Sequence, residues 1–114
     1  MSNSIPVNTE LAWAAGFFDG EGNAHFCRNS RTVGLSVTQT SLPELQRFQS
    51  TLGVGRVYGP YINKGPRNNP HWQYRIKGFQ HYQHAMCLLW RFLCQRKKDQ
   101  LKRAQRSWLE AHPA

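Results

Sequence analysis

The sequence predicts an α+β domain in which one antiparallel sheet is covered by helices. Apolar residues recur at helical spacing in some segments and alternate with polar residues in others, and turn-forming residues separate the segments. The 114 residues fit a single domain, 1–114, that begins with a loose polar arm at 1–8. The expected element order is α-β-β-α-β-β-α-α.

Caps and apolar spacing identify the helices. The first follows a possible cap at Asn8 or Thr9, and the glycine pair at 20 and 22 stops it. Ser41-Leu42-Pro43-Glu44 matches a capping box at the start of the second helix, and Gly53 ends that helix. The last two segments carry apolar residues on one side. Helices are therefore expected over 10–19, 42–52, 79–93 and 97–111.

Alternation identifies the strands. A tight polar link joins 23–29 to 32–39 as a hairpin, and a loop rich in Asn, Gly and Pro separates 54–61 from 71–77. The alternation also divides each strand into a core side and an open side. In the last strand Trp72, Tyr74 and Ile76 belong to the core, so the residues between them share the open face.

Charge and cysteine content exclude several classes of protein. Lysine and arginine number 15 against six acids, which gives a net charge of +9 and a pI near 10.1. Such a chain is expected to bind a polyanion, with nucleic acid ahead of a membrane surface. The three cysteines have no paired spacing and predict reduced thiols in an intracellular compartment, namely bacterial or phage-host cytoplasm or an organelle. No segment predicts a signal peptide or a membrane span.

A nine-residue motif narrows the choice among nucleic-acid-binding proteins. Residues 14–22 read Ala-Ala-Gly-Phe-Phe-Asp-Gly-Glu-Gly, which resembles the signature nonapeptide of the LAGLIDADG homing endonucleases. The expected element order resembles that family's α-β-β-α-β-β-α fold with a saddle-like sheet, and Gly53-Val54-Gly55 is a further match. One motif copy is similar to the single-motif members, which work as homodimers on double-stranded DNA.

The motif helix carries the residues that the resemblance assigns to the dimer. Ala12 and Gly16 lie one helical turn apart with Ala15 beside them, and small residues allow two helices to approach closely. The family packs two motif helices against each other in this way. Asp19 matches the other motif acid, which is more often structural, either at this interface or as a helix cap.

The resemblance also implies the catalytic residues. Glu21 matches the metal-binding acid, and the Gly20 carbonyl is a further oxygen ligand suited to Mg²⁺ or Mn²⁺. Lys77 matches a basic residue near the attacking water, and Gln39 matches a polar residue that positions the water. Thr40-Ser41-Leu42-Pro43 lacks the basic group that often follows in the family.

The open face and its loops supply the expected DNA contacts. Polar strand residues suit base edges, and cations at the hairpins and near the last helix suit phosphates. The expected contacts are Asn23, His25, Cys27, Arg28, Asn29, Arg31, Ser36, Thr38, Arg56, Tyr58, Lys64, Arg67, His71, Gln73, Arg75, Lys97 and Lys98.

The primary hypothesis is a homodimeric, magnesium-dependent endonuclease that cuts both strands of a long pseudo-palindromic DNA site. A family member without cleavage activity is the first alternative, acting as an RNA-splicing maturase on intron RNA or as a DNA-binding regulator. A basic ribosomal or RNA-packaging protein is the second, although it leaves the acids at 19 and 21 unexplained.

Overall fold

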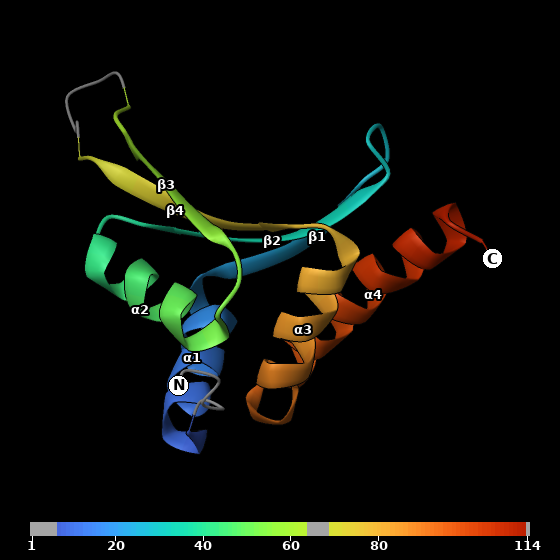
Figure 1. The fold of residues 1–114 in the computed structure, drawn as a ribbon, viewed down its shortest axis with the longest axis horizontal. Helices are drawn as coiled ribbons and strands as arrows, with labels where there is room; N and C mark the ends of the chain where they lie inside the picture. The colour runs from blue at the N-terminus through green and yellow to red at the C-terminus, as the bar shows by residue number, and fades with distance from the viewer. Residues whose placement is uncertain (1–6, 64–68, 114) are drawn as a thin grey trace.

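The computed structural model of the chain describes residues 7–63 and 69–113. It confirms the α+β class and the expected element order (Figure 1). A short 3-10 helix is the one addition. The elements are α1 (Asn8–Glu21), β1 (Gly22–Cys27), β2 (Thr32–Gln39), α2 (Leu42–Leu52), β3 (Arg56–Tyr61), β4 (His71–Lys77), α3 (Phe79–Leu89), η1 (Trp90–Phe92) and α4 (Gln95–Ala111).

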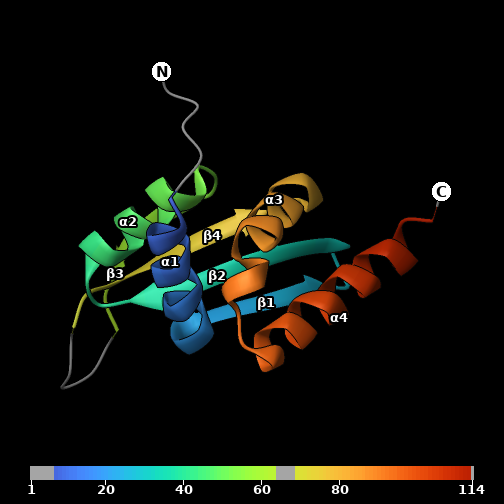
Figure 2. The ribbon, with the colours of Figure 1, turned by 90° about the horizontal axis from the view of Figure 1, so that it is seen from below.

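The four strands form one antiparallel sheet in the order β1-β2-β4-β3. Gly22 of β1 pairs with Val37 of β2, which in turn pairs with Tyr74 of β4. All helices lie on one face of the sheet, and both ends of the sheet curve away from them (Figures 1 and 2). The opposite face carries no helix, and we call it the free face.

The core lies between the helices and the sheet. Phe18 of α1 stacks on Phe48 of α2 with ring centroids 6.3 Å apart, and Phe48 meets the Tyr74 ring edge-on at 5.0 Å. Each of these rings is fully buried. The alternation in β4 is confirmed, since Tyr74 and Ile76 are buried against the helices. Strand parity therefore decides which side chains the free face presents.

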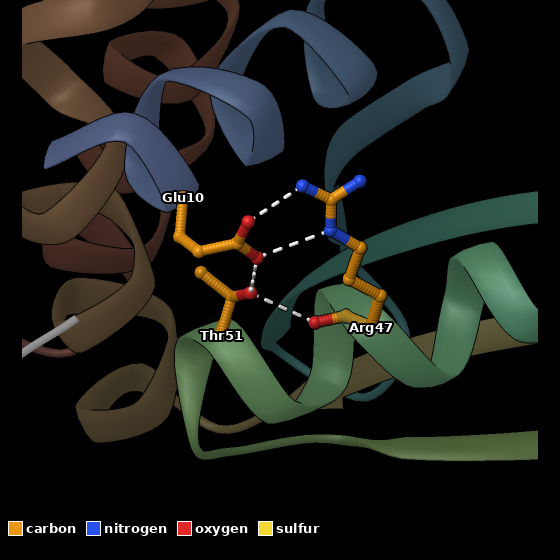
Figure 3. Close-up of polar contacts among 3 residues, drawn as sticks. All are labelled: Glu10, Arg47 and Thr51. Atoms are coloured by element: carbon orange, nitrogen blue, oxygen red, sulfur yellow. Dashed lines mark hydrogen bonds and ion pairs between the residues drawn. The ribbon is translucent and has the colours of Figure 1, made fainter. Parts of the chain in front are cut away.

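A polar cluster joins α1 to α2 (Figure 3). The Arg47 guanidinium donates to both carboxylate oxygens of Glu10, at 3.1 and 2.5 Å, and Thr51 Oγ1 donates to the same carboxylate at 3.2 Å. Arg47 also lies 3.8 Å from the Trp13 ring centroid. These contacts fix the motif helix against its neighbour.

Helix α4 covers the outer edge of β1. Gln100 Oε1 accepts from the Ala24 N–H at 3.1 Å, and Gln100 Nε2 donates to Asn23 Oδ1 at 3.3 Å. Lys97 Nζ donates to the Gly22 carbonyl. The helix thus satisfies backbone groups that an edge strand would otherwise leave unpaired.

Several boundaries differ from the sequence-based expectation. Asn8, expected in the loose arm, is the first residue of α1, and the remainder of that arm at 1–6 lies outside the described residues. Ser41 is the N-cap of α2, but its side chain makes no capping hydrogen bond, so the predicted capping box does not form. Within 7–63 and 69–113, no helix has the length and hydrophobicity needed to cross a bilayer.

Candidate nucleic-acid interface and catalytic centre

The free face is polar along every strand. Its side chains are exposed or half-buried, which confirms the parity expected from the sequence. The saddle curvature in Figure 1 makes the face concave between its two hairpin ends. Its strand residues are Asn23, His25, Cys27, Ser36, Thr38, Arg56, Tyr58, His71, Gln73, Arg75 and Lys77.

The hairpin between β1 and β2 extends this surface with Arg28, Asn29 and Arg31, all exposed. Arg31 takes the left-handed backbone conformation, with φ 58°, that closes the turn. Lys64 and Arg67, expected to serve the same purpose at the other hairpin, lie outside the described residues.

The distribution of acids leaves the free face electropositive. All six acids lie on helices, namely Glu10, Asp19 and Glu21 on α1, Glu44 on α2, and Asp99 and Glu110 on α4. The strands contain only cations among their charged residues. Between 7 and 113, outside the undescribed 64–68, the single ion pair joins Arg47 to Glu10 beneath the sheet. A polyanion approaching the strands therefore meets no carboxylate there.

The motif places one exposed carboxylate where α1 meets the sheet. Glu21 is the last residue of α1, and Gly22 begins β1. A Cβ at Gly22 would lie 2.0 Å from Phe18 Cδ1, so only glycine allows the strand to start this close to the helix. The last helical turn leaves main-chain carbonyls without intrahelical donors, Gly20 among them. Glu21 and Gly20 therefore bring oxygen ligands to one point.

The Asp19 carboxylate accepts a hydrogen bond within its own chain. Both of its carboxylate oxygens accept from the Cys94 N–H, each at 3.2 Å. Cys94 is the N-cap of α4, so Asp19 ties the end of α1 to the positive end of α4. This contact matches the capping alternative for Asp19, and its place at a dimer interface stays a prediction.

Lys97 is the clearest correction. The sequence predicts that it contacts phosphate, yet only 8% of it is exposed. Its ammonium donates to the Gly22 carbonyl and to Gln100 Oε1 at 3.3 Å, and lies 5.5 Å from the Phe18 ring centroid. Burial, with Arg96 nearby, lowers the pKa of Lys97 below its usual value. Lys97 is thus the cation nearest the Glu21–Gly22 backbone, and it does not face solvent.

Lys77 lies away from the Glu21–Gly22 end of the motif. It pairs with Gly34, three residues along β2 from Val37, the partner of Gly22. This register separates Lys77 from Gly22 by about 10 Å along the strands and about 10 Å across two of them. Within one chain the predicted grouping of Lys77 with Glu21 therefore does not occur.

Gln39 does lie at the motif end of the sheet. It closes β2 two residues past Val37, on the side away from Lys77, and it is half-buried. Parity directs it toward the helices, and its place at the strand end keeps it near Gly22. Gln39 and Lys97 therefore both lie near the Gly22 backbone, the first by strand register and the second by its hydrogen bond, whereas Lys77 lies farther along the sheet.

Lys98 remains on the helical side of the molecule, away from the free face. It is half-buried, with its ammonium 5.4 Å from the Trp90 ring centroid. Lys102 lies at the same distance from that ring. These lysines form a second cationic group next to the start of α4.

The small-residue face of α1 is only partly as expected. Ala12 and Gly16 are exposed, and a Cβ at Gly16 would meet nothing within 4 Å. Ala15 is fully buried in its own subunit, so it does not line a surface. Ala12 and Gly16 alone offer the close approach that a second helix requires.

The site's oxygen donors suit a hard cation such as Mg²⁺, which usually takes one or two carboxylates and completes its shell with waters and phosphate oxygens. Glu21 and the Gly20 carbonyl fit this partial role. No three metal-ligating side chains gather anywhere in the described part of the chain. Glu21 is thus the one side-chain ligand that the motif offers at this point.

Helical phase is the signal that could have revealed Lys97. Leu101, Ala104 and Trp108 follow it at intervals of four, three and four residues, so Lys97 lies on the apolar stripe of α4. Gln100 lies beside it and also turns toward β1. A lysine on the buried stripe of a helix needs an internal acceptor, and here the Gly22 carbonyl supplies it.

Known proteins resemble this chain in their three-dimensional structure. No family model and no curated protein matches the sequence. Solved structures do match. The homing endonuclease I-CvuI, in complex with the I-CreI target DNA, is 29% identical with a TM-score of 0.66, covering 87% of this chain and 66% of its own. I-TnaI, a homing endonuclease, is 18% identical, with a TM-score of 0.65 over 87% of this chain and 71% of its own.

A third match is the LAGLIDADG meganuclease I-CpaMI bound to uncleaved DNA. It is 17% identical, with a TM-score of 0.67, and the match covers 87% of this chain and 36% of that one. This chain therefore spans just under two thirds of I-CvuI and about a third of I-CpaMI.

These matches define the class of the domain as the saddle-sheet α+β fold of homing endonucleases. The motif at 14–22 adds a resemblance in sequence. The chain is similar in fold and in this motif to the LAGLIDADG homing endonucleases.

Proposed function

We propose that the chain is a homodimeric, divalent-metal-dependent endonuclease that cuts both strands of a long, partly palindromic DNA site. One observation carries the proposal. The concave free face bears cations and no acid, and the exposed Glu21 carboxylate lies where the motif helix joins that sheet. A basic surface that binds phosphates gains from a carboxylate only if a cation lies between them.

The dimer rests on the exposed face of α1. Ala12 and Gly16 allow a second motif helix to pack closely, and a two-fold axis there would bring two Glu21 carboxylates together. Each subunit would then meet one half of the DNA site. The I-CvuI structures are DNA complexes formed in the presence of Ca or Mg, which supports both the partner and the class of cofactor.

Glu21 and the Gly20 carbonyl would hold Mg²⁺ or Mn²⁺, which supplies charge neutralisation at the phosphate and an activated water. Lys97 donates to the Gly22 carbonyl from inside the domain and so holds the backbone turn that presents Glu21. Gln39, at the strand end, orients a water through its amide. Asp19 holds α4 so that Lys97 stays in place. Three exposed cysteines, free in the structure, support a reducing intracellular location.

A random-library cleavage experiment tests the proposal directly. Duplexes with randomised centres are incubated with the protein and Mg²⁺, and the cut ends are sequenced. One long site with two-fold symmetry, cut on both strands, is the expected result. Cut ends without a common sequence, or none at all, would contradict the proposal.

A second candidate is a DNA-binding regulator or RNA-splicing maturase without cleavage activity. The observation that favours it is the absence of a basic residue in Thr40-Ser41-Leu42-Pro43, together with the remote position of Lys77. The same library separates the two functions, because a regulator would enrich a bound sequence without producing cut ends. Retention of structured intron RNA in place of DNA would indicate the maturase.

A further inference from the structure

One arginine at the centre of the free face is held in position by its neighbours. Arg75 lies on β4, an inner strand of the sheet. Its Nε donates to Gln73 Oε1 at 2.5 Å, and its Nη2 donates to Tyr61 Oη at 3.2 Å. The guanidinium carbon also lies 4.8 Å from the Tyr58 ring centroid. A long side chain that would otherwise sample many rotamers therefore has one defined orientation.

The Gln73 amide is oriented as well. A guanidinium has only donors, so the amide oxygen must face Arg75. The amide nitrogen then points to Thr38 Oγ1, at 3.4 Å, on the paired position of β2. Three strands thus contribute to the placement of one guanidinium.

The two engaged groups, Nε and Nη2, lie along one edge of the guanidinium plane. The terminal edge still has two parallel N–H donors, one on each Nη. Within the described ranges, no carboxylate pairs with Arg75, since the one ion pair there joins Arg47 to Glu10. Three hollows of about 350, 420 and 250 Å³ adjoin it on the free face. We call these two parallel donors the fork of Arg75. The fork is open toward a ligand with two acceptors.

We propose that Arg75 is a preformed reader of guanine, and that Gln73 and Tyr61 are the residues that position it. The inference rests on the proposed function, in which DNA lies on the free face. Guanine presents O6 and N7 in the major groove, spaced to accept two parallel N–H donors. An inner strand of a concave sheet faces the groove floor, whereas hairpins and rims face the phosphates. Holding the fork in advance reduces the rotamer entropy that binding would otherwise cost.

The test uses a duplex selected by the wild-type protein from a random pool in EDTA, so that cleavage does not intervene. Each guanine is then replaced by 7-deazaguanine, which lacks the N7 acceptor. At one symmetric pair of positions the replacement should weaken wild-type binding by about fivefold or more. Arg75→Met removes both the charge and the paired donors, so this variant should bind both duplexes equally, each more weakly than the wild type does.

Two further variants test the positioning role. Gln73→Leu and Tyr61→Phe should each reduce the 7-deazaguanine penalty by about twofold or more, because each removes one hydrogen bond that orients Arg75. Gln83→Leu, an exposed position on α3, is the matched control and should keep the full penalty. Circular dichroism and thermal midpoints establish that all variants are folded.

The outcomes separate the two levels of the proposal. Failure to select any sequence would overturn the proposed function and this inference together. Selection of a site whose 7-deazaguanine penalty survives Arg75→Met would overturn the guanine reader alone. A penalty that Arg75→Met removes, but that Gln73→Leu and Tyr61→Phe leave intact, would overturn the positioning role.

Discussion

Lys97 shows how a single buried charge connects packing with chemistry. Its folded-state pKa is lowered, so between that pKa and the ordinary value near 10.5 the unfolded chain binds the proton more readily. The free energy of unfolding contributed by Lys97 therefore rises as pH rises through this window. Burial of this ammonium costs some stability, and its hydrogen bond to the Gly22 carbonyl offsets part of that cost.

Lys97→Met and Arg28→Met should have different effects. Lys97→Met should reduce cleavage and leave the salt dependence of DNA binding unchanged, because its ammonium faces Gly22. Arg28 is exposed on the hairpin beside the free face, so Arg28→Met should make the logarithmic salt slope shallower by about 0.9, the value of one phosphate contact, with cleavage preserved at saturating protein. Binding titrations at several salt concentrations, paired with single-turnover cleavage, measure both. A shallower slope for Lys97→Met would place its side chain at the surface.

Glu21→Gln should abolish cleavage in Mg²⁺ and keep specific binding within about tenfold, because the amide lacks the charge that holds the cation. Most binding energy comes from phosphate and base contacts on other elements. Glu44→Gln, an exposed acid on α2, is the matched control and should leave both properties unchanged. Gel-based cleavage and binding assays on one duplex measure the difference. Cleavage retained by Glu21→Gln would remove this carboxylate from the mechanism.

At the scale of elements, the proposed dimer depends on the exposed face of α1. A side chain at Gly16 meets no atom of its own subunit. Gly16→Leu should therefore leave the monomer folded, and even favour the helix by about 1 kcal/mol, while it separates the motif helices of a dimer. Sedimentation of the DNA complex should show one subunit per duplex for this variant and two for the wild type. Gln83→Leu on α3 is the matched control and should remain dimeric.

The packing of α3 on α4 depends on a buried tyrosine. Tyr82 Oη donates to the Leu101 carbonyl at 2.6 Å, and burial raises the pKa of Tyr82 well above its usual value. Tyr74 donates to the Val54 carbonyl at the same distance, and burial raises its pKa similarly. A raised phenol pKa means that the stability is present below pH 10 and falls away as pH rises above it.

Tyr82→Phe should lower the free energy of unfolding by about 1 kcal/mol at neutral pH, because the hydrogen bond to the Leu101 carbonyl is removed. It should also flatten the fall in stability between about pH 9 and about pH 11, because one buried phenol no longer resists ionisation. Urea denaturation across this range measures both effects, with Tyr58→Phe on the exposed face as control. An alkaline fall as steep as that of the wild type would contradict the assignment.

At the scale of the whole molecule, three free cysteines can show which face binds DNA. Cys27 lies on the free face, and hydrogen bonds from Ser30 lower the pKa of its thiol. Cys87 is exposed on α3, on the helical side. DNA should slow the alkylation of Cys27 severalfold and leave that of Cys87 unchanged, as measured by peptide mass spectrometry. Equal protection of both thiols, or protection of Cys87 alone, would place DNA on another surface.

The sequence predicted most of the fold because strand parity and helical spacing are local. β2 and β4 end at the expected residues, and their inward side chains are those that alternation selects. Glu21 could be found because the motif is contiguous. Lys97 could not be placed by charge alone, since its partner Gly22 is 75 residues away. Lys77 was misplaced because strand register, which parity does not determine, sets its distance from the motif.

The segregation of acids has a consequence for how the molecule meets DNA. With every carboxylate on the helices and only cations among the charged strand residues, the chain has an electric dipole moment that runs from the helical layer to the sheet. In the field of a duplex this dipole experiences a torque, so the sheet turns toward the phosphates before any contact forms. The torque acts over about one Debye length, roughly 10 Å at 0.1 M salt. Added salt should therefore reduce the fraction of collisions that arrive correctly oriented, in addition to weakening the complex once formed.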